Sequence, residues 1–547
     1  MSEKTFDYII VGGGSAGCTL ASRLTENSNI SVLLLEAGEK DNSIKIDMPA
    51  MIVKVVPPNK YNWNYWTEKQ TKLDNRKLFW PRGKVLGGSS AINGLLYVRG
   101  HHRDYDEWAQ LGCKGWSFED VLPYFRKSEG SDRPADDFHS VGGPLLTTQH
   151  TSDSPLNEAF LKAAEEMGLP YTDDFNGPDQ EGVGWYDQTI RGGRRQSAAR
   201  AYIHEALGRP NLTVMTEAQV TRVLLQGKKA VGVKILRKGN PETWHANHEV
   251  ILCGGAINSP QILQLSGIGD PKDIQAVGLP VIHELKAVGK NMQDHLDLTV
   301  YARLKDPISY LKYKAPHRAL LEMAKWFLKK PGMLSDCVTP VGAFLKTDKA
   351  LERPDIQFHI MLALADKPHG FEEPSSHGFG IHVCQLRPQS RGTISLHSDD
   401  PLALAKIDPN YLAVEEDLRV MREGVKIVRK LMQQPALKTL ITEEDAPWNK
   451  VDLEDDAGTD DAIRKKAETI YHPVGTCAMG PKEQATSVVD PELKVVGIEG
   501  LRVVDASVMP RLIGGNTIWS TNLHAPKHHI SNSSSQWLYC NRLCGHR

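Results

Sequence analysis

A glycine-rich turn between an apolar strand and a helix constrains the fold more than any other feature of this sequence. Residues 6–11 read FDYIIV, a short apolar run rich in β-branched side chains, and the turn GGGSAG follows at 12–17. Residues 15–25 then space their apolar side chains for one buried helix face. A second apolar run at 30–35 completes a strand–helix–strand unit, which predicts a parallel sheet.

The glycines of this turn have the spacing of a dinucleotide-binding site. Gly12 permits the tight turn, Gly14 lets the backbone approach a pyrophosphate, and Gly17 lets the helix pack closely on the strand. Ser15 and Ala16 open the helix, whose N-terminal amides and dipole attract phosphate. These five residues are therefore predicted to contact or shape a cofactor site.

An acidic residue stands where such a site needs one. Glu36 ends the second strand, where its carboxylate accepts hydrogen bonds from an adenosine ribose. A strand before the glycines, a helix after them and this acid make the motif far more specific than the glycines alone. FAD and NAD share the fingerprint, so these residues leave the choice of cofactor open.

Composition and charge exclude other classes of protein. The 547 residues are 40% hydrophobic and 24% charged, as in an ordinary soluble chain, and the net charge of -2 gives no reason to expect nucleic acid. No apolar run approaches the length of a membrane-spanning helix, and the N-terminus runs directly into a strand without a signal sequence. We therefore expect a soluble, cytoplasmic protein.

The eight cysteines form no CxxC pair, so neither a zinc site nor a redox dithiol is predicted. Cys540, Cys544 and His546 lie close together in the sequence, but a polar tail without a metal is the favoured interpretation. We expect free, reduced thiols and no bound metal.

The middle of the chain predicts a second architecture. The segments IQFHIMLAL (356–364), FGIHVCQL (379–386) and GTISLH (392–397) alternate like strands of an antiparallel sheet that roofs a substrate. Residues 415–432 form a strongly amphipathic helix.

We therefore expect an α/β fold with two interleaved domains. A Rossmann-like FAD-binding domain with a parallel sheet is predicted to comprise 1–155, 200–300 and 465–517. An α+β substrate domain with an antiparallel sheet is predicted to comprise 156–199 and 301–464.

Four further segments occur in the order typical of one flavoenzyme family. They read GKVLGGSSAINGLLYVRG at 83–100, GGAINSPQILQLSGIG at 254–269, YHPVGT at 471–476 and VDAS at 504–507. With the first glycine turn, they resemble the signature segments of the glucose–methanol–choline (GMC) oxidoreductases, nearly colinearly from residue 5 to residue 517. The resemblance implies FAD, and within the family it is strongest to bacterial alcohol and choline dehydrogenases.

The resemblance also implies where the flavin lies. Gly87, Gly88 and Ser89 would let backbone amides approach its phosphates and ring, and Asn93, followed by Gly94, would lie over the flavin face.

Further positions are implied by the same resemblance. Val220 would present its backbone to the adenine, and Asp505 with Ala506 would hold the ribityl or pyrophosphate region. Members with a covalently bound flavin carry a histidine where this chain has Ile92, so we expect noncovalent FAD.

His472 is the expected catalytic base. Oxidising an alcohol requires removal of the hydroxyl proton as a hydride leaves the carbon for the flavin, and a neutral imidazole suits that proton transfer. A lone histidine is more often structural, so its role here is implied by its place in the family's motif.

The C-terminal end departs from the family. Its dehydrogenases use the second Asn of an Asn-Thr-Asn run to hydrogen-bond the substrate oxygen, but here Ile518 follows Asn516-Thr517. A polar tail at 518–547 replaces the family's apolar helix. Asn516 or Asn522 would supply the missing hydrogen bond. A frameshifted end, and with it a catalytically impaired FAD-binding protein, is the alternative hypothesis.

The substrate prediction rests on a second departure. Choline-specific relatives place a glutamate where this chain has Pro340, so a neutral primary alcohol with a quinone-like acceptor is the main prediction. Choline dehydrogenase is the closest alternative, and an oxygen-using alcohol oxidase follows. Because quinones are lipid-soluble, peripheral association with the inner membrane is a further hypothesis.

Overall fold

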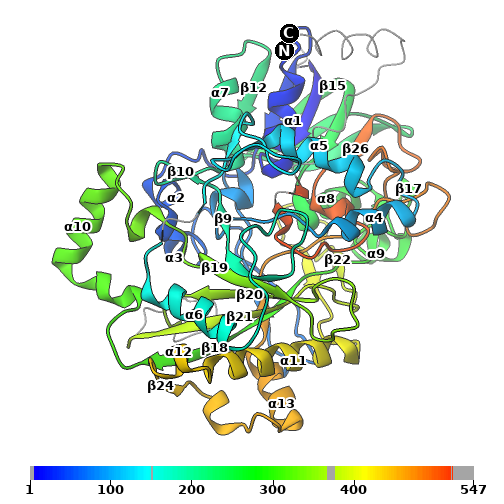
Figure 1. Ribbon diagram of the computed structural model, residues 1–547. Coiled ribbons are helices and arrows are strands. Elements are labelled where there is room, and N and C mark those ends of the chain that lie inside the picture. Colours follow the sequence, from blue (N-terminus) through cyan, green and yellow to red (C-terminus); the bar gives the residue numbers. More distant parts are fainter. Residues whose placement is uncertain (1–4, 150–151, 366–375, 519, 522–547) are drawn as a thin grey trace.

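The computed structural model describes residues 5–149, 152–365, 376–518 and 520–521. Within this part of the chain, two seven-stranded sheets organise the molecule, with the first in the upper half of Figure 1 and the second in the lower half. Both sheets collect strands from distant parts of the sequence. The predicted combination of a parallel and an antiparallel sheet is confirmed.

The first sheet is parallel through its centre. Its strands run in the order β12 (Leu212–Met215), β2 (Val32–Leu35), β1 (Thr5–Val11), β15 (Asn240–Leu252) and β26 (Leu501–Val503). The first half of the long β15 instead pairs antiparallel with β14 (Lys229–Arg237), beyond which lies β13 (Ala218–Gln226). Helix α1 (Ser15–Leu24) connects β1 to β2, as the apolar spacing predicts.

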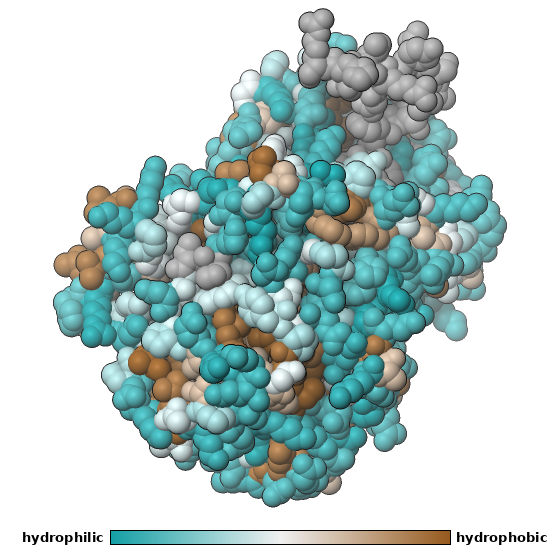
Figure 2. Space-filling view, viewed as in Figure 1, coloured by the Kyte–Doolittle hydropathy of each residue, from teal (hydrophilic) through white to brown (hydrophobic). Residues whose placement is uncertain are grey.

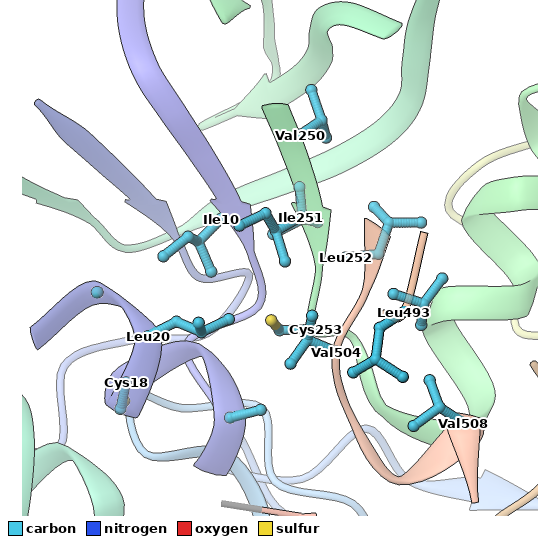
Figure 3. Close-up of a cluster of buried hydrophobic side chains, with 14 of the residues drawn as sticks. Ile10, Cys18, Leu20, Val250, Ile251, Leu252, Cys253, Leu493, Val504 and Val508 are labelled. Carbon is cyan, nitrogen blue, oxygen red and sulfur yellow. The ribbon is translucent and has the colours of Figure 1, made fainter. Parts of the chain in front are cut away.

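The core beside this sheet joins the two ends of the described chain. Figure 3 shows Ile10 and Leu20 packed near Ile251, with Val504 and Val508 on the other side of β15. All five side chains are almost completely buried. The unit around the glycine turn is therefore discontinuous, because it needs residues separated by almost the whole sequence.

The second sheet is antiparallel. Its order is β24 (Ile441–Glu444), β18 (Leu296–Leu304), β21 (Gly378–Gln385), β20 (Ile356–Met361), β19 (Val341–Leu345) and β8 (Gly182–Trp185), with β25 (Glu468–Thr469) also pairing with β18. Helix α11 (Glu415–Met432) has the predicted bounds and packs under this sheet (Figure 1). One expectation is wrong: within GTISLH, β22 (Thr393–Ser395) pairs with β23 (Lys406–Asp408), outside the sheet, because its edge groups bond to that hairpin partner.

The other elements connect or flank the sheets. The helices are α2 (Ile44–Asp47), α3 (Ile52–Val55), α4 (His102–Gln110), α5 (Phe118–Ser128), α6 (Pro155–Glu166), α7 (His204–Ala206), α8 (Gly255–Leu265), α9 (Pro271–Ala276), α10 (Pro316–Phe327), α12 (Pro435–Lys438) and α13 (Asp456–Lys466). The short strands are β3 (Tyr65–Trp66), β4 (Phe79–Trp80), β5 (Leu96–Tyr97), β6 (Glu129–Gly130), β7 (Leu145–Leu146), β9 (Asp187–Gln188), β10 (Ile190–Arg191), β11 (Arg194–Arg195), β16 (Ile268–Gly269) and β17 (His283–Glu284).

Among the described helices, none combines the length and apolarity needed to cross a bilayer. Six cysteines lie in the same part of the chain and are buried, free thiols: Cys18, Cys113, Cys253, Cys337, Cys384 and Cys477. No group of three His, Cys, Asp or Glu side chains in the described ranges is arranged to hold a metal ion.

Candidate active site

The first glycine turn has the geometry of a phosphate cradle. Gly12 has a φ of +105°, and a Cβ on it would lie 2.4 Å from the carbonyl oxygen of Cys253. A Cβ on Gly17 would lie 1.9 Å from the Gly12 oxygen, so close packing excludes any side chain there. At Gly14, by contrast, the nearest atom is 4.0 Å away. The backbone is therefore open at the one glycine that should approach a ligand.

The N-terminus of helix α1 has no side-chain hydrogen-bond acceptor capping it. Gly14 caps the helix without a side-chain hydrogen bond, and the first turn contains no acidic residue. The first amides of a helix need acceptors, and the dipole there favours an anion. An uncapped helix end beside an open glycine fits a bound phosphate.

The second glycine segment packs directly against the first. The amide of Gly87 donates to the carbonyl of Gly13 at 2.7 Å. Gly87 and Gly88 have φ values of +92° and +55°, and a Cβ on Gly88 would lie 2.7 Å from the Cα of Gly14. The two segments were predicted separately from the sequence, and the fold brings them into one wall.

Two buried carboxylates shape the same wall. Glu36 accepts hydrogen bonds from the amides of Gly13 at 2.8 Å and Gly38 at 2.7 Å, and burial raises its pKa to about 7. Asp505 accepts from the amide of Gly255 at 2.8 Å and from the Ser259 hydroxyl at 2.5 Å, and burial also raises its pKa. Asp505 thereby connects the segment that follows β26 to the start of α8.

A cavity of about 1150 Å³, counted with its open mouth, runs between these elements. Ten of the predicted cofactor residues line it: Gly12, Gly14, Ser15, Ala16, Glu36, Gly88, Ser89, Val220, Asp505 and Ala506. Four predicted residues do not line it: Gly17, Gly87, Asn93 and Gly94. Gly17 and Gly87 instead allow the close packing described above. A cavity of this volume, with an uncapped helix end on its wall, fits a dinucleotide.

His472 lies at the end of a hydrogen-bond chain that sets its tautomer. His295 is completely buried, and its Nε2 is 3.2 Å from the carbonyl oxygen of Leu386. A carbonyl only accepts, so Nε2 of His295 must carry the proton and its Nδ1 must accept. That Nδ1 is 2.9 Å from Nδ1 of His472, which therefore donates. The lone pair of His472 is left on Nε2.

The surroundings keep His472 neutral. Burial lowers its pKa well below 6.5, and His295, Arg82 and His359 lower it further because protonation would place a cation beside them. Nε2 of His472 lies 3.4 Å from the Asn516 amide nitrogen, which donates toward it. A neutral imidazole whose basic Nε2 has only this long contact with Asn516 is equipped to take a proton.

The backbone of His472 is also fixed. Its amide donates to Asp294 Oδ1 at 2.7 Å, and Asp294 Oδ2 accepts from Thr469 at 2.6 Å. The preceding residue, Tyr471, has a φ of +73°, a conformation that is uncommon for a side chain of this size. Backbone and ring are therefore held independently, as precise positioning of a reacting group requires.

Asn93 is held by a residue that the sequence analysis missed. Arg195 Nη1 donates to both the carbonyl and the Oδ1 of Asn93, each at 2.7 Å. Burial lowers the pKa of Arg195 to about 9. Asn93 is thus oriented by a buried guanidinium reached from the β10–β11 hairpin.

The second sheet contributes a polar roof that was also missed. Gln357 Nε2 lies 3.4 Å from Asn516 Oδ1 and 3.2 Å from the Tyr186 hydroxyl, and His359 stacks on Tyr186 with ring centres 5.6 Å apart. On the neighbouring strands, His382 is paired with Asp297 at 2.7 Å. The polar residues that alternate with apolar ones in β20 and β21 were the available signal, because alternate residues share a sheet face.

The end of the described chain closes the cavity. Thr517 and Ile518 are helical, Ile518 and Thr521 line the cavity, and the Ser520 hydroxyl is 2.8 Å from that of Tyr105. Asn522, Cys540, Cys544 and His546 lie outside the described residues. The predicted tail boundary at Ile518 stays a prediction, as do the domain limits.

Two family models match the chain, both described as GMC oxidoreductase, at residues 6–297 and 388–525. The chain belongs to the GMC oxidoreductase family. Because the second match ends at residue 525, the family pattern extends eight residues beyond the limit that we inferred from the motifs.

Similar proteins support the same assignment. The chain is 42% identical to human mitochondrial choline dehydrogenase, over 96% of this chain and 89% of that protein. It is also 42% identical to alcohol dehydrogenase [acceptor] of Pseudomonas putida, over 94% and 93% of the two chains. The structure superposes on pyridoxine 4-oxidase from Mesorbium loti with a TM-score of 0.87 and 29% identity, over 96% of this chain and 100% of that one.

A formate oxidase gives a TM-score of 0.89 at 28% identity, over 96% and 98% of the two chains. This GMC oxidoreductase is therefore an FAD-dependent enzyme that oxidises a CH–OH donor.

Proposed function

We propose that this GMC oxidoreductase oxidises a neutral primary alcohol to the aldehyde and passes the electrons to a quinone-like acceptor. The observation that carries the proposal is the fixed tautomer of His472, whose Nε2 lone pair lies 3.4 Å from the Asn516 amide. Nε2 of His472 and the Asn516 amide together offer one acceptor and one donor to a single hydroxyl group.

His472 and Asn516 are proposed to have different roles toward the substrate hydroxyl. His472 Nε2 accepts the hydroxyl proton, and the Asn516 amide donates to the same oxygen, where negative charge develops. Burial lowers the pKa of His295 to about 3, so His295 stays neutral and its Nδ1 continues to accept from Nδ1–H of His472 while Nε2 takes the proton. Bound FAD supplies the hydride acceptor. Asn93, held by Arg195, is proposed to orient the flavin ring.

FAD is proposed to bind noncovalently. Ile92 occupies the position at which some family members carry the covalently linked histidine, and its hydrocarbon side chain is buried in a small apolar cluster. The polar contacts of the cofactor then come from the two glycine segments, Glu36 and Asp505.

The roof favours a neutral substrate over choline. A quaternary ammonium is usually recognised by an unpaired carboxylate or by aromatic faces. Asp297 is the carboxylate on this face of β18. Its Oδ2 is already hydrogen-bonded to Nδ1 of His382 at 2.7 Å, and the carboxylate raises the pKa of His382. Choline remains the second candidate, because the human and Pseudomonas aeruginosa relatives are named choline dehydrogenases.

A quinone-like acceptor is proposed from the relative named alcohol dehydrogenase [acceptor]. Because quinones are lipid-soluble, we also propose peripheral contact with a membrane. An alcohol oxidase that uses oxygen and a catalytically impaired flavoprotein are the remaining alternatives.

One panel of assays tests the proposal. Purified protein is reduced anaerobically with butanol, decanol or choline while the flavin absorbance is followed, and turnover is measured with a quinone analogue. Bleaching by the primary alcohols at lower concentration than by choline is expected. Peroxide release in air would identify an oxidase, and a yellow protein that no alcohol bleaches would refute the proposal.

A further inference from the structure

Helix α10 has its apolar side turned away from the protein. The side chains that it buries are Glu322 and Trp326. Its outward-facing large apolar side chains, with the residue after the helix, are Leu320 (73% exposed), Leu321 (55%), Phe327 (64%) and Leu328 (67%). We call these four residues the α10 apolar face. A helix packed on a soluble protein normally shows the opposite arrangement.

Within the described part of the chain, the α10 apolar face contains the most exposed large apolar side chains. Among the described residues, fourteen large hydrophobic side chains are exposed, and the three most exposed are Leu320, Leu328 and Phe327. Figure 1 shows α10 projecting at the left edge of the molecule, and Figure 2 shows brown atoms gathered at that edge. Single exposed apolar residues are ordinary, but a contiguous group marks an interaction surface.

The charges around this face are basic. Residues 312–330 contain six Lys or Arg residues and one acid, Glu322, in a chain whose net charge is -2. Glu322 is turned inward, where it accepts from the Met333 amide at 2.7 Å and pairs with Lys325 at 2.7 Å. Lys329 and Lys330 directly follow the apolar face and are exposed. The surface therefore combines an apolar centre with a positive margin.

We propose that the α10 apolar face docks the protein on an anionic phospholipid bilayer. Leucine and phenylalanine side chains enter the boundary between headgroups and acyl chains, while lysines and arginines attract anionic headgroups. Charge complementarity selects the lipid surface over a second copy of this chain, because a second copy would place the two basic margins against each other.

Helix α10 is anchored on the segment that also carries Arg195. Trp326 donates from Nε1 to the carbonyl of Gly193 at 2.7 Å, and the Arg194 guanidinium lies over its ring at 5.3 Å. The next residue, Arg195, holds Asn93. The docking helix is thus linked, through its contacts with Gly193 and Arg194 and the adjoining Arg195, to the residue expected over the flavin. This step rests on the proposed function and implies that a lipid-soluble acceptor arrives from the docked side.

Flotation with vesicles tests the docking. The full-length holoprotein is mixed with vesicles of equimolar phosphatidylcholine and phosphatidylglycerol, or of phosphatidylcholine alone. Binding to the anionic vesicles is expected to be at least about tenfold stronger. The double variant Leu320→Asp/Phe327→Asp should lose about tenfold or more of that binding. The control Leu207→Asp changes a leucine that is 56% exposed at the end of α7, and should bind like the wild type.

A charge variant separates the two contributions. Lys329→Glu/Lys330→Glu should weaken binding to anionic vesicles by about tenfold and leave binding to neutral vesicles unchanged. Equal binding of the Leu320/Phe327 variant and the wild type would overturn the proposal. So would a dimer in vesicle-free buffer that the same variant abolishes.

Dye-linked alcohol oxidation is measured on every variant and should stay within twofold of the wild type. Because flotation is scored without substrate, an enzyme that oxidises no alcohol but still floats refutes the proposed function and leaves the docking intact.

Discussion

Replacing His295 by leucine tests the hydrogen-bond chain that is proposed to orient the catalytic base. The change removes the acceptor that the structure gives to Nδ1–H of His472, at an Nδ1–Nδ1 distance of 2.9 Å. Leucine is of similar size and is tolerated in a buried position, so the main effect should fall on His472. The imidazole can then turn or change tautomer, and either movement removes the lone pair from Nε2.

The size of the effect follows from the burial of this pair. A buried donor left without an acceptor costs about 1–3 kcal/mol. If that cost must be met each time His472 adopts the productive tautomer, kcat/KM falls by roughly 5- to 160-fold, at about 1.36 kcal/mol per factor of ten. FAD content should not change, since His295 does not line the cofactor cavity.

The matched variant is His295→Gln. A glutamine can accept from His472 through Oε1 and donate to the carbonyl of Leu386 through Nε2, as His295 does. We expect it to recover most of the activity that leucine loses. Dye-linked kcat/KM with a primary alcohol, normalised to flavin absorbance, measures both variants. A leucine variant within twofold of the wild type, or a glutamine variant as poor as leucine, would refute the reasoning.

Four further outcomes are expected. His472→Ala should lower kcat by about 10²- to 10⁴-fold with the flavin still bound, as removal of a general base does; equal activity would remove His472 from the chemistry. Asn516→Ala should lower kcat/KM by about 10²-fold through loss of a donor to the developing charge, whereas a change in KM alone would indicate simple substrate binding. Gly17→Ala should abolish FAD retention and lower the melting temperature, because its Cβ would lie 1.9 Å from the Gly12 oxygen; a yellow protein of normal stability would contradict this. His472 acts in its neutral form and its pKa lies well below 6.5, so kcat/KM should stay level from pH 8 to 6.5 and fall only at lower pH. A fall in kcat/KM centred at or above pH 6.5 would show that burial does not depress the pKa of His472.

Much of the fold followed from local patterns in the sequence. The strand, glycine turn and helix at the N-terminus were predicted because steric limits on three glycines and a period of apolar residues act over short distances. Helix α11 has its predicted bounds for the same reason. The partner of β22 was wrongly predicted, because alternation shows that a segment is a strand but does not say which edge it pairs with.

The site was less predictable than the fold. His472 and the cofactor glycines lie in recognisable motifs, but His295, Arg195 and Gln357 act through contacts between segments that are far apart in the chain. Nothing near Arg195 in the sequence indicates that its guanidinium reaches Asn93, about a hundred positions earlier. Such roles depend on tertiary geometry, which the order of residues does not reveal locally.

The late strand β26 has a consequence for how the enzyme is made. On the ribosome, β1 and its glycine turn emerge first, yet their sheet gains its last parallel strand only when Leu501–Val503 arrive, and Asp505 follows them. A nascent chain must therefore keep one edge of β15 unpaired through the synthesis of some 250 further residues. We therefore expect FAD to load after translation, and chaperones that shield that edge to raise the yield of yellow protein.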